Sequence, residues 1–134
     1  MNAPEVRRVI EDLEAEVNNG GFNQYFFNAA GNDAAAAMEA LDTIGAAAAA
    51  ALLTDACAKF PGGMPTLDRF RRQEDLERAD PDDEAFQALD DAFYASPDDL
   101  AALLAVYEAR ALPHAERRGC CTLSLDELPY VALA

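Results

Sequence analysis

Residues 16–31 read EVNNGGFNQYFFNAAG, and this stretch decides how the N-terminal half of the chain folds. It places four asparagines, one glutamine, three glycines and four aromatic residues within sixteen positions. Asparagine and glycine accept the left-handed conformation that ends a helix, so the Asn-Asn-Gly-Gly run at 18–21 predicts a helix stop. Phe22, Tyr25 and Phe26 follow at helical spacing and predict a second, short helix that Gly31 closes.

Two interpretations of this stretch stay open. In the structural one, the amides and glycines build two helix corners while the aromatic rings fill the core. In the functional one, residues 18–28, with Asn23 among them, line an amide and aromatic groove that binds a small molecule or peptide. The structural interpretation is the stronger of the two, although a turn does not require so many amides. The motif residues are Glu16, Asn18, Asn19, Gly20, Gly21, Phe22, Gln24, Tyr25, Phe26, Asn28 and Gly31.

Helical periodicity extends outward from this stretch in both directions. Apolar residues from Val6 to Val17 recur at i, i+3, i+4 and i+7, with Pro4 in the first turn. Similar patterns follow over 33–44, 46–60 and 67–76, and the run at 61–65 (Pro-Gly-Gly-Met-Pro) predicts a break. Asp80-Pro81 and Ser96-Pro97 read as starts of two further helices. The sequence therefore predicts an all-α, compact single domain over 1–134 with about seven short helices.

The C-terminal tail, 111–134, supports two readings. Residues 121–125 (Cys-Thr-Leu-Ser-Leu) alternate like a short strand. Ser124 and Glu127 instead match the capping box of a helix start. The alternatives stay open.

Composition narrows the classes of function. The chain has 134 residues and a formal charge of −15, which argues against direct nucleic-acid binding and against anionic membranes. No apolar run reaches membrane-spanning length, and three cysteines without framework spacing indicate reduced thiols. We therefore expect a cytoplasmic protein. Alanine dominates the apolar half of the composition, and such a thin core favours homodimerisation as further burial.

The acidic excess is concentrated between Glu74 and Asp99, where eleven acids face one arginine, a net charge of −10. One interpretation is that these acids cap helices and keep the protein soluble. The other is that they form a surface for a basic partner. The candidate partner-binding residues are Asp80, Asp82, Asp83, Glu84, Asp90, Asp91, Asp98 and Asp99.

The chain resembles the DNA-mimic protein (DMP) family, whose signature matches residues 16–31. The similarity continues through LDTIGAAAAAALL (41–53), the Phe-Pro-Gly-Gly turn (60–63), DRFRRQEDL (68–76) and LDDAFYASPDDLAALLAVYEAR (89–110), and so covers about 5–110. This resemblance implies an all-α domain. It also implies that the acidic surface imitates DNA phosphates and occupies the DNA-binding face of a transcription regulator, a basic partner protein.

Catalytic signatures are absent from the sequence. The single histidine, His114, lies near a predicted helix end, and the adjacent pair Cys120-Cys121 fits no zinc spacing. No phosphate-binding loop, dinucleotide fingerprint or nucleophile elbow occurs. We expect a non-enzymatic protein without catalytic residues, metal or cofactor. Besides partner binding through the acidic surface and ligand binding in the groove, a third possibility is a structural interaction domain.

Overall fold

The computed structural model describes residues 1–95 and 98–111. The predictions for the tail, including His114 and Cys120-Cys121, lie outside these residues. The chain divides into two units, Met1–Leu104 and Ala105–Ala134. The first unit contains every element described below except the second half of the last helix.

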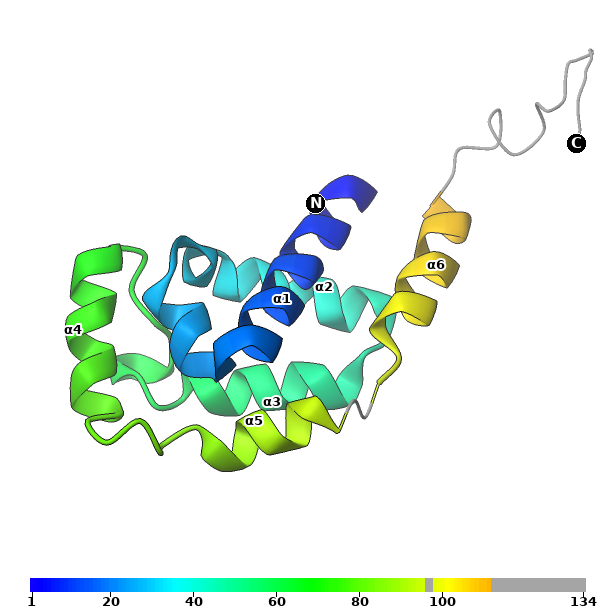
Figure 1. Ribbon diagram of the computed structural model, residues 1–134. Coiled ribbons are helices and arrows are strands. Elements are labelled where there is room, and N and C mark those ends of the chain that lie inside the picture. Colours follow the sequence, from blue (N-terminus) through cyan, green and yellow to red (C-terminus); the bar gives the residue numbers. More distant parts are fainter. Residues whose placement is uncertain (96–97, 112–134) are drawn as a thin grey trace, which may run out of the picture. The chain divides into compact units, whose positions relative to one another are not determined.

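The described residues form six α-helices and two 3₁₀ turns, with no strand among them, which confirms the all-α class (Figure 1). The first two of the seven predicted helices are joined into one element. The bounds are α1 (Ala3–Phe27), η1 (Ala29–Asp33), α2 (Ala34–Ile44), α3 (Ala47–Cys57), η2 (Pro61–Gly63), α4 (Arg69–Ala79), α5 (Gln87–Tyr94) and α6 (Leu100–Ala111).

Helix α1 begins with a complete capping box and is broken near its middle. The Asn2 side chain accepts from the Glu5 amide at 2.9 Å, and the Asn2 amide donates to Glu5 Oε1 at 3.0 Å. The break lies at Gly20 and Gly21, and Gly21 has φ 77° and ψ −178°. Only glycine adopts this backbone conformation readily. The predicted stop at 18–21 is therefore present, but helical structure resumes at once at Phe22.

Helix α1 lies at the centre of the first unit. It packs against η1, α2, α4 and α5, and α3 packs against both α2 and α5 (Figure 1). Its second half carries Phe22 and Phe26, whose rings contact an aromatic cluster from distant segments. Phe26 meets the Phe60 ring at 4.7 Å between centroids, and Phe22 meets the Phe93 ring edge-on at 5.8 Å. Such pairs stabilise a core beyond simple area burial.

The turn between α2 and α3 shows why a glycine stands at position 45. Gly45 has φ 83°, its amide donates to Asp42, and the Ala46 amide donates to the Leu41 carbonyl at 2.8 Å. These two bonds form a Schellman motif, which satisfies carbonyls left free at the helix end. The predicted break at 61–65 is likewise present as η2.

A thiol and a phenol hydroxyl are enclosed in this core. Cys57 is fully buried at the end of α3, and burial raises the pKa of its thiol to about 12. Tyr25 is 1% exposed, and its hydroxyl has no hydrogen-bond partner among the described residues. Burial, more than any neighbouring charge, raises the pKa of Tyr25.

Candidate functional site

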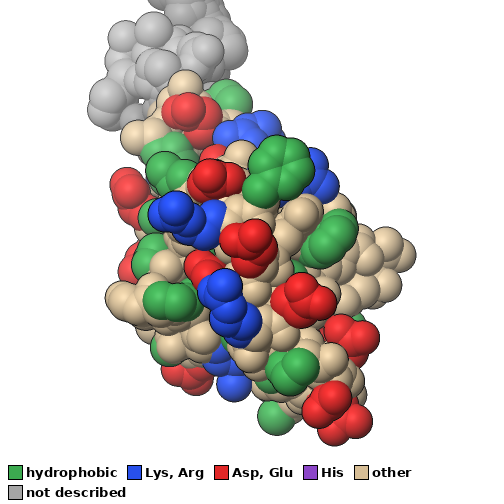
Figure 2. Space-filling model, turned by 90° about the vertical axis from the view of Figure 1, so that its left-hand side faces the viewer, with side chains coloured by type: hydrophobic (Ala, Val, Ile, Leu, Met, Phe, Trp, Pro, Cys, Tyr) green, Lys and Arg blue, Asp and Glu red, His purple; other side chains and the backbone are tan. Residues whose placement is uncertain are grey.

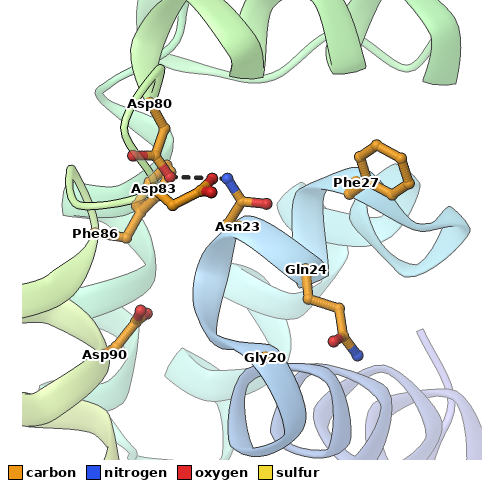
Figure 3. A pocket seen from close by; sticks show the side chains of 8 residues that line it. All are labelled: Gly20, Asn23, Gln24, Phe27, Asp80, Asp83, Phe86 and Asp90. Carbon is orange, nitrogen blue, oxygen red and sulfur yellow. Dashed lines mark hydrogen bonds between the residues drawn. The ribbon is translucent and has the colours of Figure 1, made fainter.

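Asp80 is buried, which corrects its prediction as a partner-binding and helix-starting residue. It is 4% exposed and ends α4, whereas α5 begins only at Gln87. Its Oδ1 accepts from the Ala85 amide at 2.8 Å, and its Oδ2 accepts from Asn23 Nδ2 at 2.8 Å (Figure 3). A carboxylate is needed here because it can accept from both donors at once. Asp80 thus ties the 80–86 loop to α1.

Three more of the predicted acids bind backbone amides near helix starts. Asp90 accepts from the Phe22 amide at 2.8 Å, where α1 resumes after its break. Asp98 accepts from the Ala49 amide at 2.8 Å, in the first turn of α3. Asp99 accepts from the Ala102 amide at 3.1 Å, in the first turn of α6. Carboxylates satisfy these otherwise free donors and favour the positive end of the helix dipole.

The other four predicted acids, Asp82, Asp83, Glu84 and Asp91, are exposed. Asp83 adopts a left-handed backbone with φ 57°, which aspartate tolerates better than most residues. No lysine or arginine occurs between residues 79 and 109. By contrast, α4 carries four arginines and three acids. Figure 2 faces the side on which α4 lies and shows acidic, basic and apolar side chains intermixed.

The amides of the motif are largely engaged with carboxylates. Gln24 Nε2 donates to Glu16 Oε1 at 2.7 Å, and Asn28 Nδ2 donates to the same oxygen at 3.3 Å. Asn19 donates to Gln24 Oε1 at 3.2 Å, and Asn23 pairs with Asp80. Most of the amide surplus therefore serves to join the two halves of α1 and to fix the 80–86 loop.

Arg72 holds together the corner that follows α1, a role that the sequence did not predict. Its side chain is fully buried and donates to the Phe26 carbonyl at 2.7 Å and the Asn28 carbonyl at 2.9 Å. Further bonds reach Asn32 Oδ1 at 2.7 Å and the Thr66 carbonyl at 3.0 Å. The carbonyls at the end of α1 carry partial negative charge, which compensates the buried cation.

Gly31 lies against this guanidinium. A Cβ there would come within 3.0 Å of Arg72 Nε and 2.9 Å of the Tyr25 carbonyl. The absence of a side chain at position 31 is therefore what lets Arg72 enter the corner.

Two adjoining hollows lie beside the second half of α1. One, of about 440 Å³, is lined by Gly20, Asn23, Gln24, Phe27, Asp80, Asp83, Phe86 and Asp90 (Figure 3). The other, of about 610 Å³, is bounded by Asn23, Phe27, Phe70, Gln73, Glu74, Leu76, Glu77, Asp80, Pro81 and Asp83. Because both share Asn23, Phe27, Asp80 and Asp83, we treat them as one groove. The predicted groove thus includes two motif amides but is walled mainly by later residues.

A family model described as DMP19-like protein matches residues 7–112. The chain belongs to this DMP19-like family. The match spans nearly all of the described residues and confirms the resemblance carried by 16–31 and the later blocks. No curated protein and no solved structure matches the chain significantly.

In this DMP19-like chain, the Asp90 carboxyl at the groove has a pKa above the ordinary aspartate value. Burial is the main cause, and the nearby Asp91 and Asp80 charges add to it, while the bond from Phe22 acts in the opposite direction. No group of three or more His, Cys, Asp or Glu side chains in residues 1–95 and 98–111 is arranged to hold a metal ion. Within the same residues, no helix is long and apolar enough to cross a membrane.

Proposed function

We propose that this DMP19-like chain is a non-enzymatic, cytoplasmic module that binds the basic surface of a DNA-binding protein. The observation that carries the proposal is the exposed acidic segment of Asp82, Asp83, Glu84 and Asp91, in a region without lysine or arginine. Membership in the DMP19-like family supports it. The DNA-mimic proteins of this family are named for an acidic surface that imitates DNA.

The anchoring of the acidic segment supports the proposal physically. Asp80 binds both Asn23 and the Ala85 amide, so the loop that carries three of the four exposed carboxylates is fixed to α1. Carboxylates held in place can pair with arginine forks much as phosphates do. A net charge of −15 would also attract a basic partner over a distance and accelerate association.

The test uses the full chain as bait in host extract at low salt. A triple variant, Asp82→Asn, Glu84→Gln and Asp91→Asn, should lose most of the captured basic partner. A control with three exposed acids on α2 and α3 neutralised, Glu39→Gln, Asp42→Asn and Asp55→Asn, has the same net charge and should retain it. Because charge attraction is screened by salt, the captured protein should elute as salt rises, and duplex DNA should displace it. Capture that ionic strength does not weaken would overturn the proposal.

A further inference from the structure

The side chains of Phe27 and Phe70 are held in solvent by the packing of the residues around them. Phe70 is 79% exposed and Phe27 is 50% exposed. Arg72 and Leu76, one turn apart, face inward from α4, so Phe70, two positions before Arg72, must face outward. At the same time, Gln73 and Arg69 donate to the Phe27 carbonyl at 2.9 and 3.2 Å, which fixes α4 beside the end of α1.

These two rings line the larger part of the groove described above, of about 610 Å³. Leu76 and Pro81 add apolar surface, and the exposed carboxylates Glu74, Glu77 and Asp83 also line it. The basic residues of α4 do not line it. Volumes of this size are typical of ligand pockets, and exposed aromatic side chains are typical of binding surfaces.

We propose that this groove docks a basic segment of a partner protein, with one large apolar side chain seated against Phe27 and Phe70. Lysine or arginine side chains on either side of that anchor pair with Glu74, Glu77 and Asp83. The charge of the groove selects the partner, since an acidic or neutral segment would leave these carboxylates without compensation. This docking mode rests on the proposed function and adds an apolar contact to a charged one.

Salt separates the two contributions. The carboxylate pairs weaken as ionic strength rises, whereas burial of an apolar side chain does not depend on charge screening. A partner segment with an apolar anchor should therefore keep a measurable affinity at salt concentrations that release a purely basic segment.

The probe is a phage-displayed library of short random peptides selected on the full-length protein at moderate salt. We expect recovered peptides to contain one large apolar residue flanked by lysine or arginine. Their affinity, measured by fluorescence anisotropy, should fall about tenfold or more for Phe70→Ala. The matched control Leu67→Ala removes a side chain that is 73% exposed but lines neither hollow, and it should leave affinity unchanged.

A double-mutant cycle makes the assignment specific. Replacing the apolar anchor of the peptide with alanine should weaken binding to the wild type more than it weakens binding to Phe70→Ala, which has already lost part of this contact. Phe27→Ala provides a second reading of the same contact. Additive losses, or peptides without an apolar position, would overturn the proposal.

Self-association is the other occupant to be tested. Sedimentation of the wild type that shows a dimer, converted to monomer by Phe70→Ala, would assign the groove to a second copy and overturn the partner-segment proposal. The acidic triple variant of the preceding section leaves every groove-lining residue intact. Its failure to affect the captured protein would reject the proposed function without touching the peptide result.

Discussion

The Arg72 guanidinium is enclosed by the backbone of the corner that follows α1. Its four hydrogen bonds satisfy three carbonyls and the Asn32 side chain, so this one residue joins α4 to the end of the motif. Within the helix predicted over 67–76, the apolar residue Leu76 is buried, whereas Phe70, and Leu67 just before α4, are exposed. Periodicity does not reveal a buried cation, because it assigns arginine to solvent.

Replacing Arg72 with alanine should destabilise the protein by about 3 kcal/mol or more, since several buried acceptors would lose their donor. Arg72→Lys should recover only part of this loss, because one ammonium cannot reproduce the planar fork. Arg71→Ala, at an exposed neighbouring position, is the control and should change stability by less than about 0.5 kcal/mol. Urea denaturation measures all three. Equal losses for Arg71 and Arg72 would contradict the assigned role.

Tyr25→Phe tests the unpartnered hydroxyl in the core. Removing a buried polar group that makes no hydrogen bond should leave stability unchanged or raise it by up to about 1 kcal/mol. Tyr94→Phe is the comparison, because the Tyr94 hydroxyl donates to the Val17 carbonyl at 3.0 Å and its loss should destabilise. A marked destabilisation by Tyr25→Phe would indicate a partner for this hydroxyl in solution.

At the scale of elements, the break in α1 depends on α5, because a carboxylate on α5 caps the helix where it resumes. The sequence predicts a stop at 18–21 because asparagine and glycine are local signals. That Asp90, sixty-eight residues after Phe22, would cap the restarted helix could not be predicted, since it depends on tertiary packing. The same limit explains why the helix start predicted at Asp80 is wrong. The Asp-Pro pattern is typical of a helix start, but the Asp80 carboxylate accepts hydrogen bonds from Asn23 and the Ala85 amide instead of capping a helix.

Gly21→Ala should destabilise the protein by more than about 2 kcal/mol. The backbone at φ 77° disfavours a side chain, and a Cβ would overlap the Asp90 carboxylate. Gly45→Ala is the matched control, because it also has a positive φ but opens into free space. It should cost about 1 kcal/mol from the left-handed conformation alone. Thermal denaturation of both variants checks the difference, and a larger loss for Gly45→Ala would contradict it.

Asp90 should also make stability depend on pH. Its folded pKa is raised, so the folded state holds the proton to higher pH than the unfolded chain does. Between the ordinary aspartate pKa of about 4 and the raised folded value, this residue therefore lowers the free energy of unfolding as pH rises. Asp90→Asn keeps an acceptor for Phe22 but does not titrate.

Urea denaturation across this pH window measures the difference between the two proteins. Wild type should lose stability relative to Asp90→Asn as pH rises, and a difference of opposite slope would refute the assignment. Asp90→Ala, which removes the acceptor altogether, should be less stable than Asp90→Asn by about 1 kcal/mol.

At the scale of the whole molecule, charge has two roles that the sequence alone cannot separate. Of the eight acids predicted to face a partner, Asp80, Asp90, Asp98 and Asp99 satisfy backbone amides. The core positions on α1 and the all-α class follow directly from periodicity. The groove does not, because Phe70 and Glu77 meet Asn23 and Phe27 only through the packing of α4 on α1.

The excess of negative charge should make the folded state more stable at higher salt, since self-repulsion is then screened. We expect the melting temperature to rise between about 0.01 M and 0.15 M sodium chloride, a range over which the Debye length falls from about 30 to 8 Å. Potassium chloride should give the same curve if screening is the cause. A melting temperature that falls or stays constant would show that the charges are already balanced by structure.

The reactivity of the buried Cys57 thiol can be used to measure local opening of the core. With Cys120 and Cys121 replaced by serine, it would be the single thiol of the chain. Its exchange with an aromatic disulfide reagent would proceed only when the end of α3 opens, because the folded environment excludes solvent and disfavours the thiolate. The labelling rate would then measure how often the end of α3 opens. It would also show whether a ligand bound in the groove makes this opening less frequent.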